Sequence, residues 1–292
     1  MPRSPLVSTE WLAAHLDDPG LRVFDTTLHL DQTPAGLEAR SGRAEYDAAH
    51  VPGAGFLDIV ADLSDPRSEL PFTRPAPNRL AEVLGRAGVS EQSHVVLYSA
   101  GEVMWAARAW WLLRWVGARA VTVLDGGLRK WTAEGRPVSG EPCRYPPAAF
   151  DARPVAGCWA ERDAVQEAIG DGGVCTLNAL PRPLHAGTVG LGYQRPGRIA
   201  GSANVPFPDL LDPATGAFRA PAELRKHFDE IGAFGREQVI CYCGGGIAAT
   251  QNALALVLLG HPNVTVYDGG LDEWSRNLDL PMETDEPSTD PG

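Results

Sequence analysis

Three short sequence patterns occur twice in this chain, in the same order and at nearly the same spacing. The matched pairs are residues 94–99 with 238–243, residues 123–131 with 266–274, and residues 49–54 with 197–202. The two members of each pair lie about 145 residues apart, as expected for a repeated structural unit. The sequence therefore predicts a duplicated domain, which limits the fold to two similar halves.

The length of 292 residues agrees with this interpretation, since one domain usually takes ~150 residues. We expect a first domain over residues 1–137, a linker over 138–157 and a second domain over 158–282. The linker is rich in proline, which forbids a helix or a central strand and favours a stiff connection along the surface. The acidic segment 283–292 has no apolar period and is predicted to be disordered.

Each copy alternates short apolar runs with helical patterns, which is typical of strands that are buried on both faces of a parallel sheet. The predicted strands are residues 23–25, 95–98 and 120–124 in the first copy and residues 174–177, 239–242 and 264–267 in the second. The predicted fold class is α/β, with two duplicated domains. Each domain is a small, mainly parallel sheet flanked by helices.

Charge and cysteine content exclude several classes of function. A formal net charge of −12 without a basic run argues against binding to nucleic acid or to a membrane surface. Five cysteines are an odd number and do not form the pattern of a disulfide framework. The start of the chain has no apolar core of a signal peptide, so we expect a soluble cytoplasmic protein.

Cys243 carries the strongest chemical signal. It ends the predicted strand 239–242 and precedes three glycines, Gly244, Gly245 and Gly246, after which a helix begins. Ligands of parallel α/β sheets bind at the carboxyl ends of strands, and consecutive glycines let backbone N–H groups converge on an anion. We expect these N–H groups and the helix N-terminus to depress the pKa of the Cys243 thiol and make it a nucleophile.

The other cysteines are interpreted as structural. A buried cysteine is commonly a small apolar side chain, and Cys241 points to the face of the strand opposite Cys243 because side chains alternate. Cys143 and Cys158 lie in or beside the linker, and Cys175 begins an apolar strand. One C-x-C pair is weak support for zinc, so no metal site is predicted.

At these residues the two copies resemble the tandem domains of the rhodanese family, the thiosulfate and mercaptopyruvate sulfurtransferases. The segments that carry the resemblance are residues 6–12, residues 50–54 with 56–58, residues 124–127 with Trp131, and Tyr242-Cys243 with its glycine loop. The resemblance implies a catalytically silent first domain, a reactive cysteine in the second, and a site at the interface of the domains. Ser99 stands where the second copy has Cys243, in agreement with a silent first copy.

The resemblance also implies a sulfur relay through a Cys243 persulfide. A thiolate attacks an anionic donor, thiosulfate first among them, and an acceptor such as cyanide or a small thiol then takes the outer sulfur. The loop that would hold the anionic sulfur comprises Gly244, Gly245, Gly246, Ile247 and Ala248. No metal or organic cofactor is implied.

The sequence departs from the family in ways that leave other hypotheses open. Thiosulfate enzymes often have basic residues after the cysteine, and mercaptopyruvate enzymes have a serine where this chain has Gly245. The usual Asp-x-Arg at the end of the first strand of copy two is Asn178-Ala179-Leu180. A mercaptopyruvate sulfurtransferase and a persulfide carrier that binds a protein donor or acceptor therefore remain alternatives. A phosphatase would need an arginine to hold phosphate where Ala249 stands.

Five further residues are candidates for substrate contact. An anionic donor needs local positive charge, and the nearest cations to the segment 178–180 are Arg182, Arg195 and Arg198. His50 and Asp58 match the histidine and aspartate that relay a proton in the mercaptopyruvate enzymes. The alternative interpretation is that the arginines are surface residues and that His50 fixes its own Pro-Gly turn.

Overall fold

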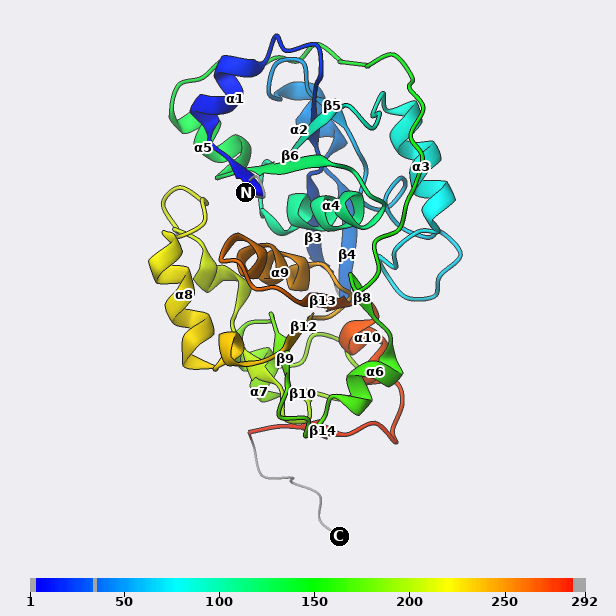
Figure 1. The fold of residues 1–292 in the computed structure, drawn as a ribbon, viewed down its shortest axis with the longest axis vertical. Helices are drawn as coiled ribbons and strands as arrows, with labels where there is room; N and C mark the ends of the chain where they lie inside the picture. The colour runs from blue at the N-terminus through cyan, green and yellow to red at the C-terminus, as the bar shows by residue number, and fades with distance from the viewer. Residues whose placement is uncertain (1–3, 34–35, 286–292) are drawn as a thin grey trace.

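The computed structural model describes residues 4–33 and 36–285. The elements of the first half are β1 (Leu6–Val7), α1 (Thr9–His15), β2 (Leu21–Asp25), β3 (Leu28–Thr33), β4 (Gly36–Ser41), α2 (Arg43–Ala48), β5 (Gly55–Phe56), α3 (Pro77–Arg86), β6 (His94–Tyr98), α4 (Met104–Trp115), β7 (Ala120–Leu124) and α5 (Gly127–Ala133). Figure 1 shows this half at the top of the molecule, with its sheet between α4 and the outer helices.

The second half lies below the first (Figure 1). Its elements are β8 (Trp159–Ala160), α6 (Arg162–Glu167), β9 (Val174–Asn178), α7 (Arg182–Ala186), β10 (Arg198–Ile199), β11 (Ala203–Asn204), η1 (Phe207–Leu210), α8 (Pro221–Glu230), η2 (Ala233–Gly235), β12 (Gln238–Tyr242), α9 (Ala248–Leu258), β13 (Val264–Tyr267), α10 (Gly270–Trp274) and β14 (Met282–Glu283). The predicted strands fall within β2, β6, β7, β9, β12 and β13, as expected from their apolar runs.

The two main sheets have the same topology. The first has five strands in the order β1-β7-β6-β2-β5, and the second, read from its other edge, has the order β8-β13-β12-β9-β11. All pairs within these two sheets are parallel. Because the order and direction of the strands match one for one, the duplication and the α/β fold class that the repeats predict are confirmed.

Helices α4 and α9 pack against each other between the two sheets, one from each half (Figure 1). Both are buried around most of their circumference, which explains why their sequences are apolar without a polar stripe. The proline-rich segment 138–157 contains no helix or strand beyond a single bridge between Ser139 and His50. It is held along the first half by backbone hydrogen bonds, for example from Ala148 to Gly85.

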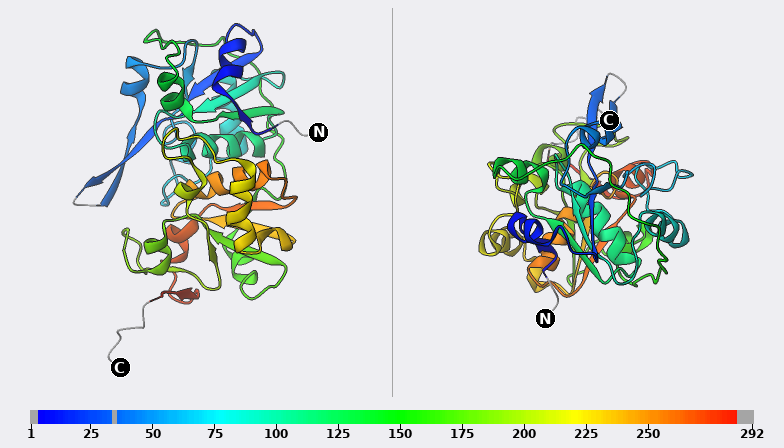
Figure 2. Two further views of the ribbon diagram at one scale, coloured as in Figure 1. Left: turned by 90° about the vertical axis from the view of Figure 1, so that its left-hand side faces the viewer. Right: turned by 90° about the horizontal axis from the view of Figure 1, so that it is seen from above.

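Strands β3 and β4 form an antiparallel hairpin that projects from the side of the first half, as the left view of Figure 2 shows. Leu30 pairs with Ala39, and Leu37 lies on the same face because opposite residues of a ladder share a side. The other face carries His29 opposite Arg40 and Asp31 opposite Glu38. The hairpin thus carries Leu30, Leu37 and Ala39 on one face and its charged residues on the other.

The prediction of disorder from residue 283 onward is wrong for residues 283–285. Strand β14 pairs antiparallel with β10, and Asp285 accepts a hydrogen bond of 2.6 Å from Arg198. The backbone N–H of Asp285 also donates to the carbonyl of Ala186. Charge pairing with Arg198 helps to order this segment, although its composition alone suggests disorder. The rest of the predicted tail, residues 286–292, lies outside the described residues.

Candidate active site

Cys243 lies directly after β12, at the carboxyl end of the second sheet, as the sequence predicts. Residues 244–247 turn the chain into α9, whose first residue is Ala248. The thiol is almost fully buried, with 2% of its surface exposed. The cysteine therefore sits before a helix N-terminus, where orphan N–H groups and the helix dipole favour negative charge.

The beginning of the loop is held by α10. The carbonyl of Cys243 accepts a hydrogen bond of 2.9 Å from Leu271, and that of Gly244 accepts one of 2.9 Å from Asp272. This close approach requires Gly270, since a Cβ there would overlap the carbonyl oxygen of Gly244. The second Asp-Gly-Gly block of the repeat thus has a structural role: its last glycine lets α10 approach and fix the backbone of Cys243 and Gly244.

The end of the loop rests on a buried ion pair. Gly246 has a φ of 71°, a region that favours glycine, and a Cβ there would lie 2.7 Å from Oδ1 of Asp268. Asp268 pairs with Arg108, which also donates to the carbonyl of Gly246 at 3.3 Å. The first half of the chain therefore shapes the loop that carries the nucleophile in the second.

Burial raises the pKa of the Cys243 thiol above its usual value. Hydrogen bonds from the backbone N–H groups of Ala249, Ala248 and Gly245 oppose this shift, and the carboxyl group of Asp272 adds to it. The expectation of a depressed pKa is wrong in its net direction, because removing the sulfur from water outweighs the N–H groups. Of the predicted loop donors, Gly245 and Ala248 lower the pKa of the thiol, and Ala249, which was not predicted, does so too.

A cavity of about 490 Å³ lies in front of Cys243, between the two halves. The second half contributes Leu180, Pro181, Leu184, Leu191, Gly192, Tyr193, Phe207, Cys243, Gly244, Gly245, Ile247, Ala248 and Asp272. The first half contributes Leu30, Leu37, Ala39, Pro71, Phe72, Met104 and Trp105. The site is therefore at the domain interface, as the resemblance implies. Gly246 belongs to the loop but does not line the cavity.

Two ionisable residues that sequence reasoning did not single out face the same cavity. Asp272 has a pKa raised to about 6 by burial, which Arg276 opposes only in part. Tyr193 has a pKa well above its usual value because of burial and of the nearby Cys243 and Asp272. The Tyr193 hydroxyl lies where a Cβ on Gly244 would be, so this glycine makes room for it. Asp272 lies in the repeated block 266–274, but nothing in that pattern marks it as a cavity residue, and Tyr193 belongs to none of the repeated blocks. Only the fold reveals that both face the cavity.

The structure does not bring the three candidate arginines to the cavity. Arg182 is an exposed residue that pairs with Asp209 at 2.7 Å. Arg195 donates four hydrogen bonds to backbone carbonyls at the last residue of α10 and beyond it, and Arg198 pairs with Glu283 and Asp285. None of the three is among the lining residues. Each guanidinium has another partner, so a direct role in substrate contact has no support here.

His50 and Asp58 also lie outside the cavity lining. His50 is fully buried and stacks on Tyr46, and its two ring nitrogens lie 2.6 and 3.0 Å from the carbonyl oxygens of Tyr46 and Glu141. Asp58 accepts hydrogen bonds from the Ser41 hydroxyl and from two backbone N–H groups that follow it. Both side chains stabilise turns of the first half.

The remaining cysteines are free thiols that do not face Cys243 across the cavity. Burial raises the pKa of Cys143, Cys158, Cys175 and Cys241. Over residues 4–33 and 36–285, no cluster of three His, Cys, Asp or Glu side chains could hold a metal ion. No helix in the same ranges is long and apolar enough to cross a membrane.

Ser99 occupies in the first half the position of Cys243 in the second. It follows β6, and its carbonyl accepts a hydrogen bond of 3.1 Å from Leu128, just as that of Cys243 does from Leu271. Its side chain accepts from the N–H of Gly101 at 3.2 Å. The backbone arrangement of the site is thus duplicated, while the thiol is not.

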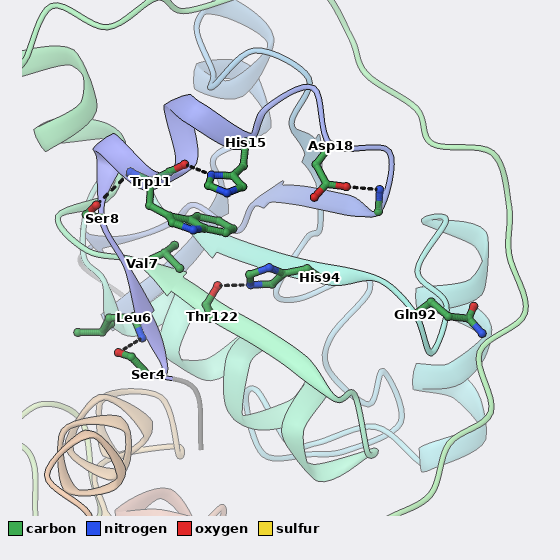
Figure 3. Close-up of a pocket in the computed structure, with 11 residues that line it drawn as sticks. Ser4, Leu6, Val7, Ser8, Trp11, His15, Asp18, Gln92, His94 and Thr122 are labelled. Atoms are coloured by element: carbon green, nitrogen blue, oxygen red, sulfur yellow. Dashed lines mark hydrogen bonds between the residues drawn. The ribbon is translucent and has the colours of Figure 1, made fainter. Parts of the chain in front are cut away.

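A second depression, of about 780 Å³, lies on the first half away from Cys243 (Figure 3). Trp11 stacks on His15 at its rim, and His94 bonds to the hydroxyl of Thr122 at 3.1 Å. The Ser8 hydroxyl caps α1 by accepting from Trp11. The polar side chains shown there have structural partners, so the smaller cavity at Cys243 is the better candidate for chemistry.

Comparison with known proteins agrees with the fold and the repeat. The family model described as "Rhodanese-like domain" matches residues 8–134 and 182–277. A thiosulfate sulfurtransferase from Cricetulus griseus is 36% identical over 96% of this chain and 94% of its own length. A 3-mercaptopyruvate sulfurtransferase from Escherichia coli K12 is 34% identical over 95% of this chain and 97% of its own.

The solved structure of a 3-mercaptopyruvate sulfotransferase from Escherichia coli superposes with a TM-score of 0.81. It is 31% identical in sequence, and the match covers 91% of this chain and 98% of that one. Both halves and the arrangement between them are therefore shared with this relative.

Proposed function

The chain belongs to the rhodanese family, and from this membership we propose that it transfers sulfane sulfur through a persulfide on Cys243. One observation carries the proposal: Cys243 lies between the end of β12 and the N-terminus of α9. The backbone N–H groups of Gly245, Ala248 and Ala249 lower the pKa of its thiol there, against the effect of burial. An anionic sulfur bound at this point gains hydrogen bonds that are already in place before the reaction.

The donor half-reaction follows from this geometry. The Cys243 thiolate attacks the outer sulfur of the donor, the bond from that sulfur to the rest of the donor breaks, and its electron pair departs with the leaving group. With thiosulfate the leaving group is sulfite. Because burial raises the pKa of the thiol, the three N–H groups matter most for holding charge on the persulfide that results.

A persulfide carrier supplied by a protein donor is the second candidate. It is favoured by the absence of Lys, Arg and His among the described residues that line the cavity, since small anionic donors need positive charge. The two candidates differ in whether a small donor alone loads the cysteine. The proposal includes a protein that donates or accepts the sulfur, and a location in the cytoplasm. The five free cysteines agree with a reducing compartment.

Intact mass spectrometry tests the proposal. The protein is incubated with thiosulfate or with 3-mercaptopyruvate, and a gain of one sulfur atom that cyanide removes as thiocyanate is expected. Cys243→Ser should gain none, while Cys143→Ser, a change at a partly exposed free cysteine, should behave as the parent. Equal loading of Cys243→Ser would contradict the proposal. Loading only in the presence of a protein donor would favour the carrier.

A further inference from the structure

The cavity at Cys243 is larger than its small-molecule donors need. A volume of about 490 Å³ lies within the range of roughly 300–1,000 Å³ that is typical of pockets for ligands much larger than thiosulfate or cyanide. Since the loop at one end of the cavity is enough to hold an anionic sulfur, most of the space is available to a second reactant.

The walls of this space are almost entirely apolar. Two sides are formed by Phe72 and Trp105 from the first half and by Leu180, Leu191 and Phe207 from the second. The described lining includes no cation, so an anionic group that lies against these walls, away from the loop of Cys243, would lose its hydration without gaining a partner.

The one carboxyl group in the lining adds to this selectivity. Asp272 is near Cys243 and Tyr193 and has no cation among the lining residues to pair with. Above pH 6 its carboxylate places negative charge inside the cavity, because its pKa is raised to about 6. A second carboxylate brought by a ligand would then be repelled at short range.

The hairpin β3–β4 completes the cavity wall with apolar side chains that are still partly exposed to solvent. Leu30 and Leu37 line the cavity and yet keep 38% and 41% of their surfaces exposed. They lie on one face of the hairpin, while the charged residues Asp31, Glu38 and Arg40 lie on the other. Covering two such leucines with an apolar ligand removes hydrocarbon from water and is favourable.

We propose that this cavity binds the sulfur acceptor, and that the acceptor is an uncharged thiol with an apolar body. The inference rests on the proposed persulfide at Cys243 and adds the class of compound that discharges it. The acceptor sulfur attacks the outer sulfur of the persulfide anion and the sulfur–sulfur bond to Sγ breaks. The electron pair of that bond remains on Sγ, which takes up the proton of the thiol, and the product leaves as a persulfide anion.

A pair of thiols that differ by one charge tests the proposal. Protein loaded with one sulfur is mixed with benzyl mercaptan or with its para-carboxylate, and loss of the added sulfur is followed by intact mass. We expect benzyl mercaptan to discharge the persulfide at least about tenfold faster, which corresponds to ~1.4 kcal/mol. Equal rates, or a faster reaction with the carboxylate, would overturn the inference.

The hairpin supplies matched variants. Leu37→Lys adds a cation to the cavity wall at a half-exposed position and should cut the preference for benzyl mercaptan several-fold. Leu278→Lys makes the same change at a residue that is 76% exposed and outside the cavity lining, and it should leave the preference unchanged. A preference that Leu37→Lys leaves intact would show that the hairpin does not contact the acceptor.

A binding measurement separates this inference from the proposed function. Benzyl alcohol and its para-carboxylate have the shapes of the two thiols but cannot accept sulfur, and both can be tested for protection of Cys243 against iodoacetamide. Protection by the neutral alcohol alone supports the apolar site even if no persulfide forms. Protection by neither compound, or by both equally, overturns the inference even if the persulfide does form.

Discussion

Arg108 and Asp268 form a buried ion pair across the interface between the two halves, with 2.6 Å between Nη1 and Oδ1. Their side chains are 1% and 4% exposed. The same guanidinium donates to the carbonyls of Gly246 and Phe72, one in the loop after Cys243 and the other in the cavity wall. One arginine of the first half thus ties the nucleophile loop to the opposite wall of its cavity.

Replacing Arg108 by methionine leaves the Asp268 carboxylate buried without its main partner. We expect the free energy of unfolding to fall by about 3–5 kcal/mol, the cost of breaking a buried pair. Urea denaturation measures this loss. The exposed pair of Arg153 with Glu91 is the control, and Arg153→Met should cost no more than about 1 kcal/mol. Similar losses in both variants would contradict the assigned role of Arg108.

Gly246→Ala is expected to lower both stability and the rate of persulfide formation. The new Cβ meets Asp268 at 2.7 Å in addition to the strain of a positive φ, so the loss should be about 3 kcal/mol or more. Gly135 has nearly the same φ, 70°, with open space around its missing Cβ. Gly135→Ala should therefore cost only about 1 kcal/mol and leave the rate unchanged. Thermal unfolding and loading kinetics of both variants decide the matter.

Asp272→Asn should stabilise the protein at neutral pH and have little effect in acid. The folded-state pKa of Asp272 is raised from 3.8 to about 6, so the fold favours the neutral carboxyl. That contribution is present in full below pH 3.8 and is lost as pH rises through 6. An asparagine stays neutral throughout, so the variant should gain about 1–3 kcal/mol over the parent near pH 7.5. The free energy of unfolding of the variant and the parent, measured near pH 7.5 and below pH 3.8, checks the sign of this difference.

The same substitution should make Cys243 easier to ionise. The Asp272 carboxylate raises the pKa of the Cys243 thiol, so removing its charge should move the pH profile of alkylation by iodoacetamide to lower pH. Arg276→Gln, which removes the one cation that lowers the pKa of Asp272, should not produce this shift. A profile that is identical in Asp272→Asn and the parent would show that the two side chains do not interact.

Ending the chain at Pro281 should destabilise the second half, whereas ending it at Asp285 should not. The shorter chain loses the β14–β10 pairing and the partners of Arg198. We expect a loss of about 2 kcal/mol from the missing hydrogen bonds and from the apolar surface of the core that Met282 no longer covers. Differential scanning calorimetry of the two truncations gives the comparison. Equal melting temperatures of the two truncations would show that residues 282–285 do not stabilise the second half.

The elements that the sequence predicts correctly are those with strong local patterns. The apolar runs that became β6 and β12 are buried on both faces of their sheets, so nothing in the tertiary structure competes with their local preference. Cys243 could be placed at a strand end because the run of glycines permits no other continuation. Its position before α9 needed no coordinates.

The features that could not be predicted depend on contacts between distant segments. Asp272 became a cavity residue only because α10 folds back on the loop after Cys243. The direction of the Cys243 pKa shift depends on burial between two halves, which a local pattern of glycines does not report. In the sequence Arg108 is a charged residue within an apolar helix, and its partner Asp268 is known only from the fold. The β3–β4 hairpin, by contrast, shows alternating polarity around Leu30 and was within reach of the sequence.

The apolar hairpin belongs to the copy that lacks the cysteine, yet it borders the cavity of the copy that has it. The leucines of the cavity wall, Leu30 and Leu37, consequently lie about two hundred residues before Cys243 in the sequence. A substitution in the hairpin can therefore change the cavity wall and leave the residues around the thiol as they are. A chain cut between the copies would separate Cys243 from Leu30 and Leu37, and neither piece would hold the complete cavity.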